Sequence, residues 1–216
     1  MITTSFWQEM GERQARWDFT SHPFMRRWAD GSLRSDELAE YAGEYDHLVV
    51  ATAVAWRRAT EAGGARYERR AVEAEGEVHL WRAFSKRAGW GGWGAWYYAE
   101  DPLPATVDCA RVWAGEPGRG LPEQLATLWA IESLSAATSR LKLAGLLEHY
   151  GFDDGPATEY LWRRATGDGE KSLLTSGWLA DSLPEGDPTV MLEQVEAVHR
   201  GHWLMLEDLE AAGARA

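Results

Sequence analysis

The sequence predicts an all-α protein, a single domain over residues 1–216 made of about seven packed helices. Apolar side chains recur at steps of three and four along nearly every long stretch, which is the period of a helix, and no alternating strand pattern stands out. Glycine and proline separate these stretches, and the chain contains neither an internal repeat nor a linker long enough to divide domains.

The first half of the chain predicts three helices. The stretch of residues 20–34 contains a short helix, with a stop signal at Asp30 and Gly31. Residues 35–61 form a long helix with one apolar stripe, and two glycines follow it. Residues 65–88 form the next helix, whose aromatic side chains predict one buried face.

The second half begins with an irregular stretch. Residues 89–98 are rich in glycine and tryptophan, a composition that fits either a loop packed on the core or a mobile lid over an aromatic pocket. A short helix at 105–113 follows. Residues 121–150 predict one long helix, residues 156–183 a helix interrupted at its central glycines, and residues 188–212 the last helix.

Composition narrows the classes of function. Lys+Arg total 22 and Asp+Glu total 34, so the formal net charge is −12, which disfavours nucleic acids and anionic membranes as partners. No apolar run approaches the ~20 residues of a membrane span. The one cysteine, Cys109, cannot form a disulfide within the chain, and this favours the reducing cytoplasm. We expect a soluble cytoplasmic protein whose partner is a small molecule.

Titratable residues on faces that should be apolar are the candidates for function, because burying them is costly unless something pairs with them. Glu132 shares its helix face with Leu125 and Leu128, so its carboxylate is predicted to point inward, either to act in a site or to bond to the backbone of a neighbouring helix. His199 and His202 lie in the apolar stripe of the last helix. Two such histidines can bind a metal or transfer protons, or can simply be hydrogen-bonded in the core.

Further polar groups share faces with apolar residues: Glu75 with His79, Glu44 with His47, and Arg164 with Asp168 and Lys171. The last group has an intrahelical ion pair as its alternative interpretation. Acids, bases and imidazoles that face inward from five helices predict a shared polar pocket in the bundle.

Six segments carry a family resemblance: His22-Pro23-Phe24-Met25, Asp30-Gly31-Ser32-Leu33, Tyr45-Asp46-His47-Leu48, His79-Leu80-Trp81-Arg82-Ala83-Phe84, Leu128-Trp129-Ala130-Ile131-Glu132 and His202-Trp203-Leu204-Met205. Together they resemble the TenA/PqqC proteins of the heme-oxygenase-like superfamily. The resemblance covers nearly the whole chain and implies the heme-oxygenase-like fold and a homodimer. It is specific for the fold and weak for the reaction, because this fold hosts many chemistries.

In the iron-dependent oxidase branch of that superfamily, the resemblance implies metal ligands at an early Glu and His, at the central Glu, and in a late His-x3-Asp-x2-His motif. The late motif reads Arg164-x3-Asp168-x2-Lys171 here, and neither cation ligates iron as imidazole does. The usual di-iron site is therefore predicted to be lost, with no cofactor in its place. The alternative is a non-heme iron site with the reduced ligand set Glu75, His79, Glu132 and Asp168, which His202 could complete. Glu73 and Glu77 are rivals of Glu75 as the acid of this set.

Other branches fit in part. The TenA branch implies a nucleophilic cysteine on the central helix, which this chain lacks, so thiaminase-type hydrolysis is disfavoured. The PqqC branch implies oxidation by oxygen without a metal, with His, Arg, Tyr and Lys holding a polycarboxylate. A pocket of histidines, Arg164 and Lys171 ringed by tryptophan is most similar to that style.

We therefore expect a small-molecule biosynthetic enzyme, a PqqC-like oxidase or cyclase that oxidises or rearranges an anionic, partly aromatic metabolite. The expected catalytic residues are His79, Glu132, His199 and His202. The expected substrate-binding residues are Arg164, Lys171, Asp168, Glu44, His47, Tyr45, Trp129 and Trp203. The alternatives are the non-heme iron oxidase with its reduced ligand set and a non-catalytic ligand-binding protein.

Overall fold

A computed structural model describes residues 4–90, 102–133 and 135–214. Within these ranges the chain forms nine α-helices and three short 3-10 helices and no strand, which confirms the all-α class and corrects the expected number of helices. The α-helices are α1 (Thr4–Ala15), α2 (Pro23–Ala29), α3 (Ser35–Gly63), α4 (Glu68–Arg87), α5 (Pro104–Ala114), α6 (Leu121–Ser133), α7 (Ser135–His149), α8 (Glu159–Ser182) and α9 (Pro188–Gly213). The 3-10 helices cover Phe19–Ser21, Ala65–Tyr67 and Leu183–Glu185.

The helix predicted over residues 121–150 is described as two helical stretches, α6 and α7, on either side of residue 134, whose structure is not described. Ser133 donates to the Ala130 carbonyl at 3.1 Å, and Thr138 donates to the Ser135 carbonyl at 3.2 Å. These bonds satisfy hydroxyl groups within their own helices.

The break predicted within α8 is wrong, because this helix continues through its central glycines. Its first half is held to α4 by the ion pair of Arg164 with Glu77, and its second half is held to α6 by the hydrogen bond of Thr175 to Glu132. Tertiary contacts on both sides therefore outweigh the low helix propensity of glycine.

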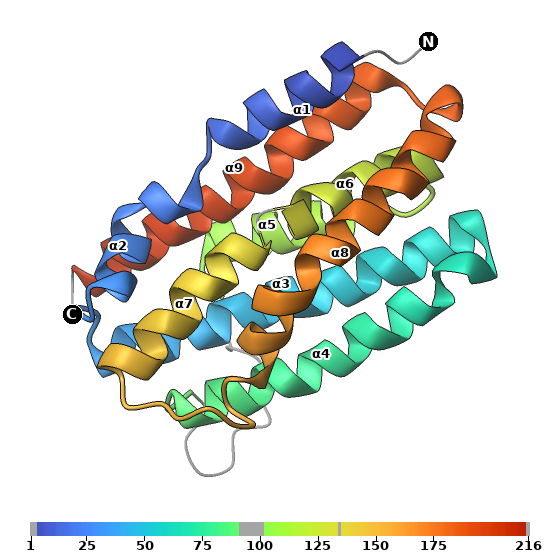
Figure 1. The fold of residues 1–216 in the computed structure, drawn as a ribbon. Coiled ribbons are helices and arrows are strands. Elements are labelled where there is room, and N and C mark those ends of the chain that lie inside the picture. The colour runs from blue at the N-terminus through green and yellow to red at the C-terminus, as the bar shows by residue number, and fades with distance from the viewer. Residues whose placement is uncertain (1–3, 91–101, 134, 215–216) are drawn as a thin grey trace.

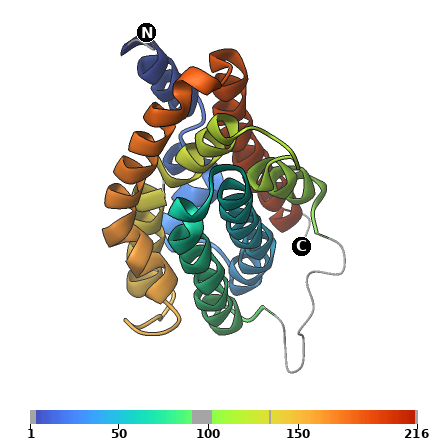
Figure 2. The ribbon, with the colours of Figure 1, turned by 90° about the vertical axis from the view of Figure 1, so that its right-hand side faces the viewer.

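The helices form a bundle around α6, which contacts α3, α8 and α9. Figure 1 shows α1 beside α9 along one edge and α3 beside α4 along the opposite edge. In Figure 2 the pair of α3 and α4 lies between α8 on one side and α5 on the other. Among the described helices, none combines the length and apolar character of a membrane span.

Close contacts with α2 hold the segment of α7 that carries Lys142. The indole Nε1 of Trp28 on α2 donates to the backbone carbonyl of Lys142 at 3.0 Å. A Cβ atom on Gly145 would lie 2.8 Å from the carbonyl oxygen of Trp28, so only glycine lets the two helices approach this closely. Trp28 is fully buried, and it anchors the α7 segment that carries Lys142.

Candidate functional site

Glu132 is buried on α6, as the sequence predicted, and it lies between two helices. Its Oε1 accepts from Arg70 on α4 at 2.6 Å, and its Oε2 accepts from the Thr175 hydroxyl on α8 at 2.6 Å. Arg70 also donates to Glu73 at 2.5 Å, and its guanidinium lies over the ring of Trp56. The carboxylate is thus held by an ion pair to α4 and a hydrogen bond to α8. Its partners are side chains and not the helix backbone that the structural alternative named.

Arg164 and Lys171 share the carboxylate of Glu77, a pairing that the sequence did not predict. Glu77 on α4 accepts from Arg164 Nη1 at 2.9 Å and from Lys171 Nζ at 2.8 Å. Arg164 also donates to Ser135 at 2.6 Å and to Tyr160 at 3.0 Å. Glu77 therefore supplies the negative charge that we expected from a bound ligand.

The inward placement predicted for Glu75 and His79 is wrong, because both side chains are exposed. Glu75 forms a surface ion pair with Arg57, in which one contact measures 2.7 Å. The buried face of α4 instead carries Arg70, Ala71, Ala74, Glu77, Trp81, Phe84 and Ser85. Glu75 and His79 share their face with the small residues Val72 and Ala83, and Val72 is itself exposed. Trp81 and Phe84, which bury far more area, fix the rotation of the helix.

The alternative iron ligands are consequently not brought together. Glu75 and His79 face outward, while Glu132 is engaged by Arg70 and Thr175. The side chain of Asp168 lies outside the part of the chain that the structure describes. Among the described residues, no three His, Cys, Asp or Glu side chains are grouped closely enough to hold a metal ion. These residues do not fit the reduced iron site.

The bundle interior contains a lysine that the sequence interpretation did not single out. Lys142 on α7 is buried, its Nζ donates to the Tyr41 hydroxyl, and it lies 4.9 Å and 4.4 Å from the ring centroids of Tyr41 and Tyr45. Burial, reinforced by the positive charge of Arg164, lowers the pKa of Lys142 to about 7. No carboxylate pairs with this amine in the described part of the chain.

His202 on α9 also contacts the Tyr45 ring, at 5.6 Å between centroids. Its ring also contacts Phe19 at 4.3 Å and Trp113 at 5.5 Å. Burial, together with the charge of Lys142, lowers the pKa of His202 well below its ordinary value. We call Tyr41, Tyr45, Lys142, His199 and His202 the Lys142 cluster.

His199 and His202 share an uncommon property. Both imidazoles are buried, and neither nitrogen of either ring has a hydrogen-bond partner among the described residues. Burial lowers the pKa of His199 to about 3, so the ring is neutral at pH 7. Buried polar atoms without partners cost about 1–3 kcal/mol each and are usually satisfied by water or a ligand.

Of the remaining residues predicted for the site, Glu44, Trp129 and Trp203 have hydrogen-bond partners other than the imidazoles of His199 and His202. Glu44 is buried, and its Oε2 accepts from the backbone N–H of Leu103, where α5 begins, at 3.1 Å. His47 is half-buried on the same helix. Trp129 donates to Ser176 at 3.0 Å, and Trp203 donates to Glu207 at 3.0 Å. Described indoles that contact the cluster are instead Trp28, on Tyr41, and Trp81 and Trp113, on Tyr45. Most of the predicted lid over residues 89–98 lies outside the described residues.

Two solved structures share this helical arrangement. A TenA homologue from P. horikoshii OT3 aligns with a TM-score of 0.71 at 13% identity, over 97% of this chain and 98% of that chain. A domain of unknown function with a heme oxygenase-like fold, from Shewanella denitrificans OS217, aligns with a TM-score of 0.71 at 14% identity, over 98% of this chain and 94% of that chain. This chain has the heme-oxygenase-like fold. At these identities the likeness establishes the fold, and the fold that the sequence resemblance implied is confirmed. No protein-family model and no curated protein sequence matches the chain.

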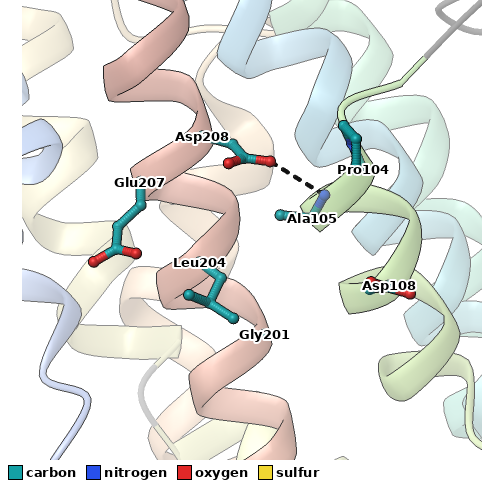
Figure 3. A pocket seen from close by; sticks show the side chains of 7 residues that line it. All are labelled: Pro104, Ala105, Asp108, Gly201, Leu204, Glu207 and Asp208. Atoms are coloured by element: carbon teal, nitrogen blue, oxygen red, sulfur yellow. Dashed lines mark hydrogen bonds between the residues drawn. The ribbon is translucent and has the colours of Figure 1, made fainter.

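The heme-oxygenase-like bundle also has a surface hollow of about 250 Å³ between α5 and α9. Figure 3 shows its lining, in which Asp208 accepts from the backbone N–H of Ala105 at 3.3 Å. The other lining residues are Pro104, Asp108, Gly201, Leu204 and Glu207. None of them belongs to the Lys142 cluster, so the hollow and the buried cluster are separate features of the fold.

Proposed function

We propose that the protein is an enzyme that acts on a small, anionic and partly aromatic metabolite bound at the Lys142 cluster. The observation that carries this proposal is Lys142 itself, a buried amine without a carboxylate partner in the described part of the chain. A buried charge is tolerated only when an opposite charge or strong hydrogen bonds compensate it. A substrate carboxylate beside Nζ would supply that charge.

The surroundings of the amine favour an aromatic ligand. The rings of Tyr41 and Tyr45 stack at 5.4 Å, and Trp81 packs against Tyr45 at 4.7 Å. Aromatic walls of this kind favour offset or edge-on contact with another ring, and each contact contributes about 0.5–1.5 kcal/mol beyond its buried area.

His202 is the proposed general base. Its ring is kept neutral by burial, and its nitrogens have no partner among the described residues, so a proton on a bound metabolite would find a free acceptor. The reaction class we propose is an oxidation or rearrangement that begins with this proton removal. In this proposal Glu132, Glu77 and Arg164 do not touch the substrate, and their ion pairs hold α4, α6 and α8 in place around the cluster.

Binding can be tested without knowing the substrate. Benzoate carries both a ring and a carboxylate, cyclohexanecarboxylate carries only the charge, and benzyl alcohol carries only the ring. We expect benzoate to bind more tightly than either control by calorimetry, and Lys142→Met to weaken benzoate binding at least tenfold. Equal binding of benzoate by the wild type and by Lys142→Met would contradict the proposed anion site.

Catalysis is tested by turnover. A metabolite extract is incubated with the wild type or with His202→Phe, in air and without oxygen, and compared by mass spectrometry. We expect an anionic metabolite to be consumed, and a product to accumulate, only with the wild type. A metabolite that the wild type retains but leaves unchanged would favour a non-catalytic binding protein. Turnover without oxygen would favour rearrangement over oxidation.

A further inference from the structure

Lys142 differs from the other two lysines of the chain, Lys86 and Lys171. Lys86 is exposed at the end of α4, and Lys171 is paired with Glu77. Only Lys142 combines full burial with a phenolic hydroxyl as its hydrogen-bond partner. We propose, on the basis of the function above, that Lys142 forms a covalent imine with a carbonyl substrate that carries its own carboxylate, such as an aromatic 2-oxo acid.

The geometry supports this chemistry because it leaves the amine free to lose its proton. A carboxylate within reach would hold the lysine as an ammonium ion, and the described residues place none there. The groups that face Nζ are Tyr41 and Tyr45 from α3, His202 from α9, and the positive charge of Arg164 from α8. The phenols and the imidazole are neutral, and the guanidinium opposes a second positive charge.

The protonation of the amine agrees with this arrangement. With its pKa lowered to about 7, Lys142 is about half neutral at pH 7. An ordinary lysine is neutral in roughly one molecule of a few thousand at the same pH. The neutral amine is the nucleophile, and desolvation in an apolar site is one of the ways in which proteins activate it.

Tyr41 is placed to move the protons. The amine lone pair attacks the carbonyl carbon, the new C–N bond forms, and the carbonyl oxygen takes a proton to give a carbinolamine. Nitrogen then loses a proton, the C–O bond breaks with a second protonation of oxygen, and one water leaves as the C=N bond forms. No electron is gained or lost overall, so no oxidant or reductant is needed. Burial raises the pKa of Tyr41 well above its ordinary value, so the hydroxyl keeps its proton and can pass it between nitrogen and oxygen.

The substrate class follows from the same contacts. A protonated imine keeps the positive charge at the place where the ammonium stood, and the substrate's own carboxylate compensates it. Its aromatic ring would lie against Tyr45 and Trp81, which are buried on α3 and α4. A 2-oxo acid is preferred over a simple ketone because its carboxylate adjoins the carbon that nitrogen attacks.

Reductive trapping tests the proposal. The full-length protein is incubated with phenylglyoxylate at pH 7.5, reduced with cyanoborohydride, and analysed by intact mass and peptide mapping. We expect one dominant adduct on Lys142, formed at least about tenfold faster than on Lys86 or Lys171 in the same molecule. Comparable labelling of the three lysines would overturn the proposal, and this comparison requires no variant.

Two variants sharpen the test. Lys142→Arg keeps the charge but cannot form the imine, so it should bind benzoate and give no adduct. Tyr41→Phe should slow trapping about tenfold while benzoate affinity changes less than about twofold, because only proton transfer is lost. Unchanged trapping in Tyr41→Phe would remove Tyr41 from the chemistry. If benzoate binds and no imine is trapped, the imine fails alone; if benzoate does not bind to the wild type, the proposed function fails.

Discussion

Replacing Lys142 with methionine should make the protein more stable at neutral pH and remove a specific pH dependence of its stability. The pKa of this amine is about 7 in the folded protein, and it returns to about 10.5 in the unfolded chain. A pKa difference of one unit corresponds to about 1.4 kcal/mol. The free energy of unfolding is therefore about 5 kcal/mol lower at pH 7 and below than at pH values above 10.5.

The sign follows from proton uptake. Between about pH 7 and 10.5 the unfolded chain holds a proton on Lys142 that the folded protein has released. Wild-type stability therefore rises with pH across this window, by about 1.4 kcal/mol per unit. Lys142→Met lacks this contribution, so its advantage over the wild type should shrink by about 2.3 kcal/mol between pH 7, where the folded amine is about half protonated, and pH 9.

The assay is urea unfolding of both proteins at pH 6, 7, 8 and 9, followed by tryptophan fluorescence. The difference between the two free energies of unfolding is the readout, because the lost hydrogen bond to Tyr41 shifts it by a constant amount over this range. Lys86→Met, at an exposed site, is the control and should show a flat difference. A flat difference for Lys142→Met would refute the reasoning, because it would mean that the buried amine keeps an ordinary pKa.

Three further predictions concern the buried polar residues. Glu77→Gln should cost about 3–5 kcal/mol, because it removes the carboxylate that two cations of α8 share, whereas Glu75→Gln at an exposed ion pair should cost less than about 1 kcal/mol. Thr175→Val should cost about 1–3 kcal/mol by removing a buried hydrogen bond to a carboxylate, and Thr166→Val on the exposed face of the same helix should cost almost nothing. His199→Phe should reduce the loss of stability in acid by about 1.4 kcal/mol per pH unit below 6.5, because the unfolded chain takes up a proton that this buried ring takes up only near pH 3.

Urea unfolding checks all three. Equal effects of the two glutamate substitutions would mean that Glu77 does not hold a buried ionic network. Equal effects of the two threonine substitutions would argue against the hydrogen bond that fixes the second half of α8. A His199→Phe variant that loses stability in acid as steeply as the wild type would show that the histidine is accessible to water.

The sequence by itself determined the fold class and most of the helix positions. Burial of apolar stripes at helical spacing is a local property that one segment reveals without its neighbours. The same property correctly placed Glu132, His199 and His202 inside the bundle, because each lies among apolar residues that fix the rotation of its helix. The pattern also correctly predicted that Glu44 is buried, but it did not predict its bond to the backbone N–H of Leu103.

The rotation of α4 was not determined in this way. Glu73, Glu75 and Glu77 are spaced so that several faces of this helix carry acids, and the sequence offered His79 as the marker of the inward face. Burial of Trp81 and Phe84 sets the rotation of α4, and Glu77 lies on the same inward face. Its carboxylate is tolerated there because Arg164 and Lys171 of α8 neutralise it, and these two cations lie 87 and 94 positions away along the chain, which no local pattern contains.

The burial of Lys142 follows from a helical stripe in the sequence, but the residues of that stripe are not typical of a buried face. Lys142 lies in the stripe formed by Ser135, Thr138, Ser139, Gly145 and Leu146, whose small and polar members do not look like a buried face. Only the tertiary structure shows that the large rings of Trp28, Tyr41 and Tyr45 fill the space beside this stripe and cover the amine. The sequence thus determined which helices exist, whereas the pairing of buried charges depended on the packing of distant helices, because a charge is stabilised by whatever lies next to it in space and not by its neighbours along the chain.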